Sequence, residues 1–306
     1  MPVTESQTRV RVRVPAKVNL HLGVGDLRPD GFHELVTVFH AVDVYDEVRA
    51  HPAVGLQLEM SGEGADDLPR GPDNVAWQAA SRLAELAQVA PDVRLDIAKS
   101  IPVAAGMAGG SADAAGTLLA CATLWHTGSS KAALADMAAE LGSDIPFPLM
   151  GGTALGTGRG EQLSPVLTTG SLDWVFAFAD FGISAADAYR ELDRLRSCGT
   201  APDPAGPPDE LLDALRVADT GRVAAALVND LQPASLSIAP DLQRTLDTGL
   251  ELGALAAIIS GSGPTCAFLC TDPDSAVQLA LELSASNTCH NARAGRGPVH
   301  GARIVV

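Results

Sequence analysis

The stretch that decides the fold runs from Pro102 to Asp113 and reads Pro-Val-Ala-Ala-Gly-Met-Ala-Gly-Gly-Ser-Ala-Asp. It follows an apolar segment over 93–101 that predicts a strand, and it leads into an Ala-rich segment over 111–125 that predicts a helix. A turn in this position presents successive backbone N–H groups, and the helix start adds the positive end of its dipole. The stretch therefore indicates a phosphate site. The alternative is a tight turn whose small residues serve packing alone.

Two better-known phosphate motifs are absent from the chain. No Gly-Lys pair occurs, which excludes a Walker A loop, and 102–113 does not contain the dinucleotide-binding pattern G-x-G-x-x-G. Ser111 stands where its hydroxyl could cap the following helix or reach a phosphate-bound Mg²⁺. The sequence thus favours a phosphate loop of another kind.

Upstream of this stretch the pattern is that of strands. Arg9–Val14 alternates Arg and Val, and Pro15 is expected to end that strand. Val18–Val24 predicts a second strand, Arg28–Gly31 has the residues of a turn, and Leu35–Val48 resumes strand character. We therefore expect a long hairpin over 18–48.

The remaining segments predict a second, separate unit. In the first half we expect strands at 54–60 and 93–101, a hairpin at 151–166, and helices at 75–88 (capped by Asn74), 111–125 and 130–142. In the second half we expect strands at 174–179, 255–260, 265–270 and 302–306 and helices at 184–196, 209–228, 241–252 and 274–285. Without the inserted helices this second order is β-α-β-β-α-β, which places a boundary near residue 165.

Composition limits the partners. The chain has 306 residues, 46% of them hydrophobic, which is enough for a sizeable core and typical of two domains. Its 21 Lys and Arg against 37 Asp and Glu give a net charge of −16. That sign disfavours nucleic acid and membrane surfaces as partners. It leaves room for a small anionic substrate, because a local site can oppose the global charge.

Cysteine usage and hydropathy point to a cytoplasmic protein. The five cysteines are odd in number and lack zinc-like spacing, so we expect reduced, buried thiols. No apolar core of a secretory signal is evident near the N-terminus. The Gly- and Ala-rich segment 103–125 is interrupted by Asp113, so we expect no membrane span there.

Three further segments could carry chemistry. Lys17, one of three lysines, lies among apolar residues, where its charge could face a phosphate or a reacting oxygen; an edge lysine facing water is the alternative. Asp144 precedes Ile-Pro, so its backbone is restricted, and it could accept a proton from a hydroxyl or bond its own turn. The Ser-Gly-Ser-Gly-Pro turn at 260–264 lacks the pattern of a nucleophile elbow. His33-Glu34 lacks the second His of a zinc-protease motif.

Together these segments resemble the GHMP kinase superfamily, named for galacto-, homoserine, mevalonate and phosphomevalonate kinases. Residues 102–113 resemble its glycine-rich signature, and 260–263 resembles its third motif. Within the superfamily, Pro15–Leu20 and Arg28–Leu35 are similar to the 4-diphosphocytidyl-2-C-methyl-D-erythritol kinase family. The resemblance covers essentially the whole chain, and the combination in this order is more specific than any one motif.

The resemblance implies an α+β fold with two domains. Residues 1–165 would form a domain like the second domain of ribosomal protein S5, and 166–306 would form a ferredoxin-like domain. It implies an ATP-dependent kinase that phosphorylates the 2-hydroxyl of the diphosphocytidyl substrate, giving the 2-phosphate and ADP, in the non-mevalonate route to isopentenyl diphosphate. ATP and Mg²⁺ would be the cofactors. The protein would act on this small molecule as a monomer or homodimer.

The resemblance also implies which residues act on the substrate. Lys17 and Asp144 would form the catalytic pair, with Asp144 accepting the hydroxyl proton and Lys17 stabilising charge. The substrate pocket would contain four more residues: Asn19, Phe32, His33 and Tyr189.

The ATP site follows in the same way. The phosphates would be wrapped by a loop of eleven residues: Pro102, Val103, Ala104, Ala105, Gly106, Met107, Ala108, Gly109, Gly110, Ser111 and Ala112. Asn74 and Lys99 would lie on the nucleotide side, and Ser111 would be a Mg²⁺ ligand.

The chain departs from the family pattern in two places. Ala104, Ala105 and Ala108 stand where glycine is common. Since alanine resists positive φ, we expect either a stiffer loop or negative φ at these positions. Phe32 replaces the more usual Tyr, which keeps the ring and loses a hydroxyl.

Two alternatives remain at this point. One is another small-molecule kinase of the superfamily, of the homoserine or mevalonate type, which the segment around Phe32 and His33 disfavours. The other is a non-catalytic protein built on an S5-like domain that binds RNA. The net charge of −16 disfavours it.

Overall fold

Two long antiparallel strands, β1 (Val10–Leu27) and β2 (His33–His51), form the centre of the larger sheet. The computed structural model describes residues 9–305. The expected break at Pro15 is wrong, because β1 continues through it. The register between the two strands shifts between Pro15 and Ala16. Such a bulge tolerates a residue that cannot donate a ladder hydrogen bond.

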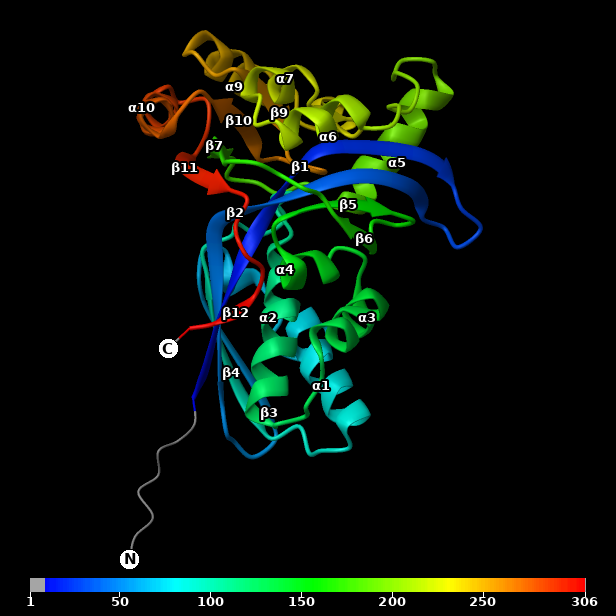
Figure 1. Cartoon of the computed structure of the whole chain (residues 1–306), viewed down its shortest axis with the longest axis vertical. Helices are drawn as coiled ribbons and strands as arrows, with labels where there is room; N and C mark the ends of the chain where they lie inside the picture. The colour runs from blue at the N-terminus through cyan, green and yellow to red at the C-terminus, as the bar shows by residue number, and fades with distance from the viewer. Residues whose placement is uncertain (1–8, 306) are drawn as a thin grey trace, which may run out of the picture.

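The larger sheet has eight strands, and its main path runs β12-β1-β2-β4-β3. Besides β1 and β2, the sheet contains β3 (Leu56–Gly62), β4 (Val93–Lys99), β5 (Thr153–Thr157), β6 (Gln162–Pro165), β8 (Val228–Asn229) and β12 (Arg303–Ile304). Four helices of the first half pack on it or on one another: α1 (Val75–Ala87), α2 (Gly109–Leu124), α3 (Lys131–Leu141) and α4 (Pro146–Met150). Figure 1 shows this layer in the lower part of the molecule, with α2 against the sheet.

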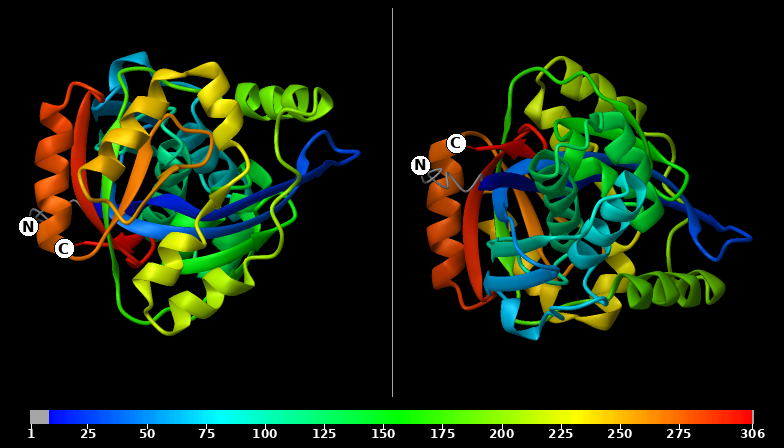
Figure 2. Two further views of the ribbon diagram at one scale, coloured as in Figure 1. Left: turned by 90° about the horizontal axis from the view of Figure 1, so that it is seen from above. Right: turned by 90° about the horizontal axis from the view of Figure 1, so that it is seen from below.

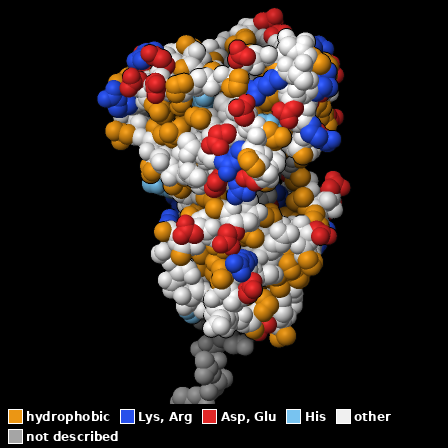
Figure 3. Space-filling model, turned by 90° about the vertical axis from the view of Figure 1, so that its right-hand side faces the viewer, with side chains coloured by type: hydrophobic (Ala, Val, Ile, Leu, Met, Phe, Trp, Pro, Cys, Tyr) orange, Lys and Arg blue, Asp and Glu red, His pale blue; other side chains and the backbone are white. Residues whose placement is uncertain are grey.

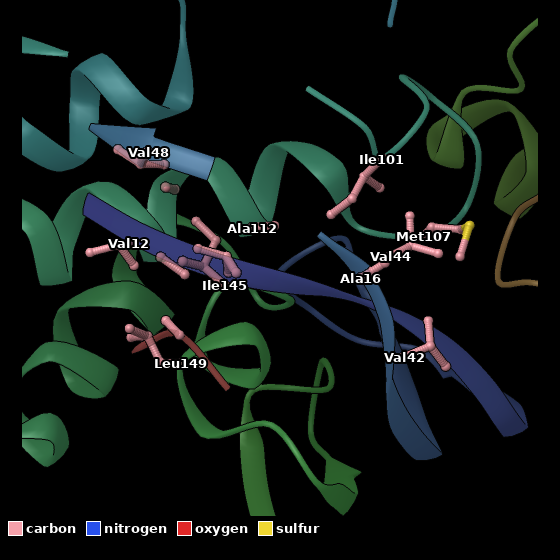
Figure 4. Packing of buried hydrophobic residues seen from close by; sticks show 14 of the residues in the cluster. Val12, Ala16, Val42, Val44, Val48, Ile101, Met107, Ala112, Ile145 and Leu149 are labelled. Atoms are coloured by element: carbon pink, nitrogen blue, oxygen red, sulfur yellow. The ribbon is translucent and has the colours of Figure 1, made fainter. Parts of the chain in front are cut away.

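The core between sheet and helices extends to the predicted phosphate loop. Ile101, just before that loop, and Met107, within it, are fully buried and belong to the same cluster as Ala16 and Val44. Figure 4 shows these side chains together at one end of the packed layer. Burial of this kind anchors the loop at its start and near its middle, since each large apolar side chain stabilises its position by about 1.5–3 kcal/mol.

The smaller sheet has four strands in the order β11-β7-β10-β9, all antiparallel. They are β7 (Leu172–Phe178), β9 (Ala256–Ile259), β10 (Cys266–Cys270) and β11 (Asn291–Gly297). The helices of this half are α5 (Ala185–Ser197), α6 (Asp209–Arg216), α7 (Thr220–Ala225), α8 (Gln232–Ile238), α9 (Asp241–Glu251) and α10 (Pro273–Ala285). In Figure 2, seen from above, α5 lies beside the projecting end of the β1–β2 hairpin.

The order β-α-β-β-α-β is present, but its last strand is not the one expected. β11 closes the smaller sheet, whereas β12 pairs with β1 of the larger sheet. The sequence of β11, Asn-Ala-Arg-Ala-Gly-Arg-Gly, carries no large apolar residue that would announce a strand. Residue 306 of the expected strand lies outside the described residues.

Several boundaries also differ. The helix expected over 209–228 is two helices, α6 and α7, and the short elements α4, α8 and β8 were not expected. α2 begins at Gly109, so Ser111 lies inside its first turn and does not cap it. The caps at Asn74 and Ser130 are confirmed, since each accepts a backbone N–H of the helix that follows.

The division near residue 165 stays a prediction. The smaller sheet lies wholly after it, but β8 and β12 come from the second half and join the larger sheet. All five cysteines are free, as expected, but the expectation that all are buried is wrong, because Cys198 is exposed and Cys289 is only partly buried. Among residues 9–305, none of the helices has both the length and the apolar run needed to traverse a bilayer.

Candidate active site

Lys17 and Asn19 lie side by side on β1 and begin a buried polar chain. Lys17 Nζ donates to Asn19 Oδ1 at 2.5 Å, and Asn19 Nδ2 donates to Thr37 Oγ1 of β2 at 2.8 Å. Thr37 Oγ1 in turn donates to the His21 carbonyl at 2.8 Å. This series of hydrogen bonds fixes the rotamers of Lys17 and Asn19. The alternative of a lysine facing water is wrong, because Lys17 is only 5% exposed.

The charge of Lys17 is balanced mainly by Asp144, on the opposite side of the site. Burial lowers the pKa of Lys17, and the carboxylate of Asp144 raises it in the opposite direction. No carboxylate of the described residues lies within 4.0 Å of Lys17 Nζ. The Phe39 ring lies 5.8 Å from this atom and adds a weak cation–π attraction. Lys17 and Asp144 are thus electrostatically coupled but leave space between them.

The loop 102–108 and the turn 260–264 interlock above Lys17. Gly106 has φ +75, and a Cβ there would lie 1.9 Å from the Ser260 carbonyl oxygen. Ser260 Oγ donates to the Gly106 carbonyl at 3.0 Å. A Cβ on Gly261 would lie 2.9 Å from Lys17 Nζ. Both glycines are therefore required for the close approach of the two segments.

Two of the three loop alanines that stand where glycine is common adopt positive φ. Ala104 and Ala108 adopt positive φ, at 50° and 60°, so negative φ is excluded at these two positions. Each such residue costs roughly 1–2 kcal/mol relative to glycine. Among the described residues, Ala105 is not one of those with positive φ. The loop thus holds local strain beside the site.

Two cavities meet at Asp144. The larger, of about 750 Å³, lies between β1, β2 and α5, and the smaller, of about 430 Å³, lies at the start of α2. Five residues line both: Ala104, Gly106, Ala108, Ser143 and Asp144. In Figure 3 the face that carries the hairpin end and α5 is hollowed at mid-height, with charged side chains of both signs around it.

The smaller cavity accounts for part of the predicted ATP site. Its lining includes seven residues of the loop and helix start: Ala104, Ala105, Gly106, Ala108, Gly109, Gly110 and Ser111. A Cβ on Gly110 would meet only Val75, at 3.7 Å, so this position is open to the cavity. Four others of the predicted set line neither cavity: Pro102, Val103, Met107 and Ala112.

Asn74 and Lys99 also line neither cavity. The side chain of Asn74 caps α1, where its Oδ1 accepts from Ala76 N at 2.8 Å. Lys99 Nζ lies beneath the loop, bonded to Asp46 and, at 2.7 Å, to Asp113. Both are buried supports of the site in this structure.

The larger cavity brings together Phe32, His33 and Tyr189. The rings of His33 and Tyr189 stack at 5.2 Å, and His33 Nε2 lies 2.9 Å from Asp193 Oδ1. Phe32 is half exposed, with the Arg159 guanidinium 5.0 Å from its ring. Burial raises the pKa of the Tyr189 hydroxyl, as does the charge of Asp144.

Sequence reasoning missed three of the five charged residues that line this cavity, Arg159, Arg190 and Asp193. Its basic residues are Lys17, Arg159 and Arg190, against two acidic residues, Asp144 and Asp193. Three positive and two negative groups give a local excess of +1 within a chain of −16. The only sequence signal was that a local site can oppose the global charge. Nothing in it pointed to particular arginines.

Comparison with known proteins identifies the family. Residues 74–152 match the GHMP kinases N terminal domain, and residues 211–288 match the GHMP kinases C terminal domain. The 4-diphosphocytidyl-2-C-methyl-D-erythritol kinase of Mycolicibacterium smegmatis is 55% identical over 297 residues, 97% of this chain and 92% of that protein. This chain belongs to the 4-diphosphocytidyl-2-C-methyl-D-erythritol kinase family. The expected resemblance is confirmed, and the chain is a small-molecule kinase of the ATP-dependent GHMP superfamily.

Other members of the kinase family agree. The proteins of that name from Mycobacterium tuberculosis and Salinispora arenicola are 54% and 55% identical over 97% and 96% of this chain, and 93% and 94% of their own lengths. A crystal structure of 4-(cytidine 5'-diphospho)-2C-methyl-D-erythritol kinase superposes with a TM-score of 0.76 at 32% identity. That match covers 93% of this chain and 98% of the other.

More distant kinases share the fold alone. Homoserine kinase from Cytophaga hutchinsonii has a TM-score of 0.76 at 18% identity, over the full length of both chains. The α+β GHMP architecture is confirmed, whereas the alternatives of a homoserine or mevalonate kinase and of an RNA-binding protein are not favoured.

Proposed function

We propose that this chain transfers the γ-phosphoryl group of ATP to the 2-hydroxyl of 4-diphosphocytidyl-2-C-methyl-D-erythritol, within the non-mevalonate route to isopentenyl diphosphate. Its relatives at 54–55% identity carry the name of that kinase. The observation that carries the proposal is that Asp144 lines both cavities. A hydroxyl bound in one cavity can thus meet a phosphate bound in the other.

At this junction Asp144 accepts the proton of the 2-hydroxyl while the hydroxyl oxygen bonds to the γ-phosphorus. The bond to the bridging oxygen breaks, and ADP leaves. A positioned base is worth about 10²–10⁴ in rate. Lys17 faces the charge that develops on the oxygens, and its bond to Asn19 holds it there.

The smaller cavity would hold the ATP phosphates against the start of α2. Unpaired N–H groups of the first turn and the helix dipole attract anions. The open position at Gly110 leaves room for a phosphate to approach this backbone.

One oxygen donor for Mg²⁺ stands in the same cavity, namely the Ser111 hydroxyl. Mg²⁺ takes few protein ligands and completes its shell with phosphates and water, so a site with few protein donors fits it. Within residues 9–305, no three His, Cys, Asp or Glu side chains gather as a metal cluster. The ion would neutralise charge on the phosphates.

The larger cavity would hold the rest of the substrate. Phe32 and Tyr189 offer aromatic faces to cytosine, and His33 offers a polar edge. Arg159 and Arg190 add positive charge for the diphosphate.

The test is ADP release from Mg·ATP with three acceptors: the diphosphocytidyl substrate, homoserine and mevalonate. We expect turnover with the first alone, and a product carrying a new phosphomonoester at the 2-position. Turnover with either of the other acceptors at a comparable kcat/KM would contradict the proposal.

A further inference from the structure

A cluster of three buried charges lies directly beneath the phosphate loop. Lys99 from β4, Asp46 from β2 and Asp113 from α2 have side chains exposed by 3% or less. Lys99 Nζ donates to Asp46 Oδ2 and, at 2.7 Å, to Asp113 Oδ2. We call these three residues the Lys99 cluster.

The cluster bonds the backbone at both ends of the loop. At the entry, Asp46 Oδ1 accepts from the N–H groups of Ser100 and Ile101, at 2.6 and 2.8 Å. At the exit, Lys99 Nζ donates to the Gly109 carbonyl at 3.3 Å. The two ends are thereby joined through one ion pair.

Gly109 has no side chain, which leaves room for Lys99 at the exit of the loop. A Cβ on Gly109 would lie 3.3 Å from Lys99 Nζ and 3.2 Å from Ile101 Cγ2, so it would point down into the cluster. Both glycines line the smaller cavity, but Gly110 is exposed and a Cβ there would meet only Val75, at 3.7 Å. The helix start is therefore oriented with one face on Lys99 and the other toward the phosphates.

Stability alone is a poor explanation for this arrangement. Buried ion pairs are weak contributors to stability, because desolvation offsets their attraction. One carboxylate oxygen, Asp113 Oδ1, has no hydrogen-bond partner among the described residues. Burial raises the pKa of Asp113, against the opposing charge of Lys99. Replacement of a buried ion pair by well-packed apolar residues is often neutral or stabilising.

We propose that the Lys99 cluster positions the phosphate loop. It fixes the two loop ends relative to each other, so that the first N–H groups of α2 point into the smaller cavity. Lys99 acts through the backbone of Ser100, Ile101 and Gly109 and does not touch the nucleotide, since it lines neither cavity. This role rests on the proposed ATP site and gives Lys99, Asp46 and Asp113 a positioning role beneath it.

The test uses Lys99→Met, with Lys131→Met as a matched control on the exposed first residue of α3. Calorimetry measures the affinity for Mg·ADP, and steady-state kinetics measure KM for ATP and for the phosphoryl acceptor. We expect Lys99→Met to weaken Mg·ADP binding about tenfold or more, as for a lost charged hydrogen bond. The acceptor KM should stay within about twofold, because the larger cavity does not contain the cluster. Lys131→Met should match wild type.

Equal affinity for Mg·ADP in folded Lys99→Met and wild type would overturn the proposal, as would equal increases in both KM values. If Lys99→Met does not fold, Asp113→Asn decides, since it keeps the side-chain shape and an acceptor for Lys99. It should weaken Mg·ADP binding and speed amide exchange at Ser100 and Ile101; unchanged values of both would also overturn the proposal. Wild type that binds Mg·ADP but phosphorylates none of the acceptors would instead contradict the proposed function alone.

Discussion

Gly261 and Lys17 come from opposite halves of the chain, and a Cβ on Gly261 would lie 2.9 Å from Lys17 Nζ. Gly261 also has φ +55, which side chains rarely adopt. The turn at 260–264, in the second half of the chain, thus covers Lys17 of the first half with the backbone of Gly261. Any side chain at this position must move Lys17, the loop or both.

Gly261→Ala should therefore lower kcat at least about tenfold, because displacing a catalytic group by an ångström can cost a hundredfold. Gly55→Ala is the matched control, since Gly55 has φ +70 and nothing within 4 Å of its Cβ position. Both variants should lose roughly 1–2 kcal/mol of stability from backbone strain. Equal kcat values in the two variants would show that Lys17 does not depend on this contact.

The two adjacent glycines at the start of α2 should respond in opposite ways. Gly110→Val should weaken ATP binding with little change in melting temperature, since this position faces the smaller cavity. Gly109→Val should mainly destabilise the fold, because its side chain would meet Ile101 and Lys99. Nucleotide calorimetry and thermal unfolding of both variants check this, and the reverse pattern would show that the helix start is oriented differently.

The aromatic wall of the larger cavity should matter for the acceptor and not for ATP. Phe32→Ala should raise KM for the diphosphocytidyl substrate about ten- to a hundredfold, given about 1–3 kcal/mol for stacking of a base. Phe181→Ala is the control, since Phe181 is similarly exposed and does not line this cavity. A parallel rise in KM for ATP would argue against a separate cytidine subsite.

His40 should make stability pH-dependent. Burial lowers its pKa to about 4, below an unfolded value of about 6.5. Between these values the unfolded chain binds the additional proton, so stability is full above pH 6.5 and is lost as pH falls toward 4. His40→Asn, which can still bond Thr153 Oγ1, should unfold at a temperature that changes less between pH 7.5 and 5.

The comparison for this experiment is His126→Asn, at an exposed position. Its pH profile should run parallel to that of wild type. If the His40→Asn profile were equally steep, another group would be responsible for the loss of stability in acid.

The sequence predicts the elements with a strong period and the motif residues, and it does less well where packing decides. The hairpin of β1 and β2 and the helices that begin after Asn74 and Ser130 follow from alternation and caps. β12 has two residues and pairs with β1 only because the chain returns there, which no local pattern announces.

The same limit applies to the site. Lys17, Asn19 and Asp144 are found by motif, and the structure brings all three to one cavity. Lys99 comes directly before the phosphate loop in sequence, yet its side chain lies beneath the loop, where it pairs with Asp46 of β2 and with Asp113 of α2. Which of two glycines faces the ligand also depends on the start of α2, which lies two residues earlier than the sequence indicates.

The central claim is that Asp144 acts at the junction of the two cavities. The most direct measurement is kcat of Asp144→Asn with Mg·ATP and the diphosphocytidyl substrate, together with calorimetric affinities for both ligands, against Asp136→Asn on the exposed face of α3. The account predicts that kcat falls about 10²–10⁴-fold while both affinities stay within a few-fold of wild type. Turnover of Asp144→Asn near that of wild type and of Asp136→Asn would contradict it.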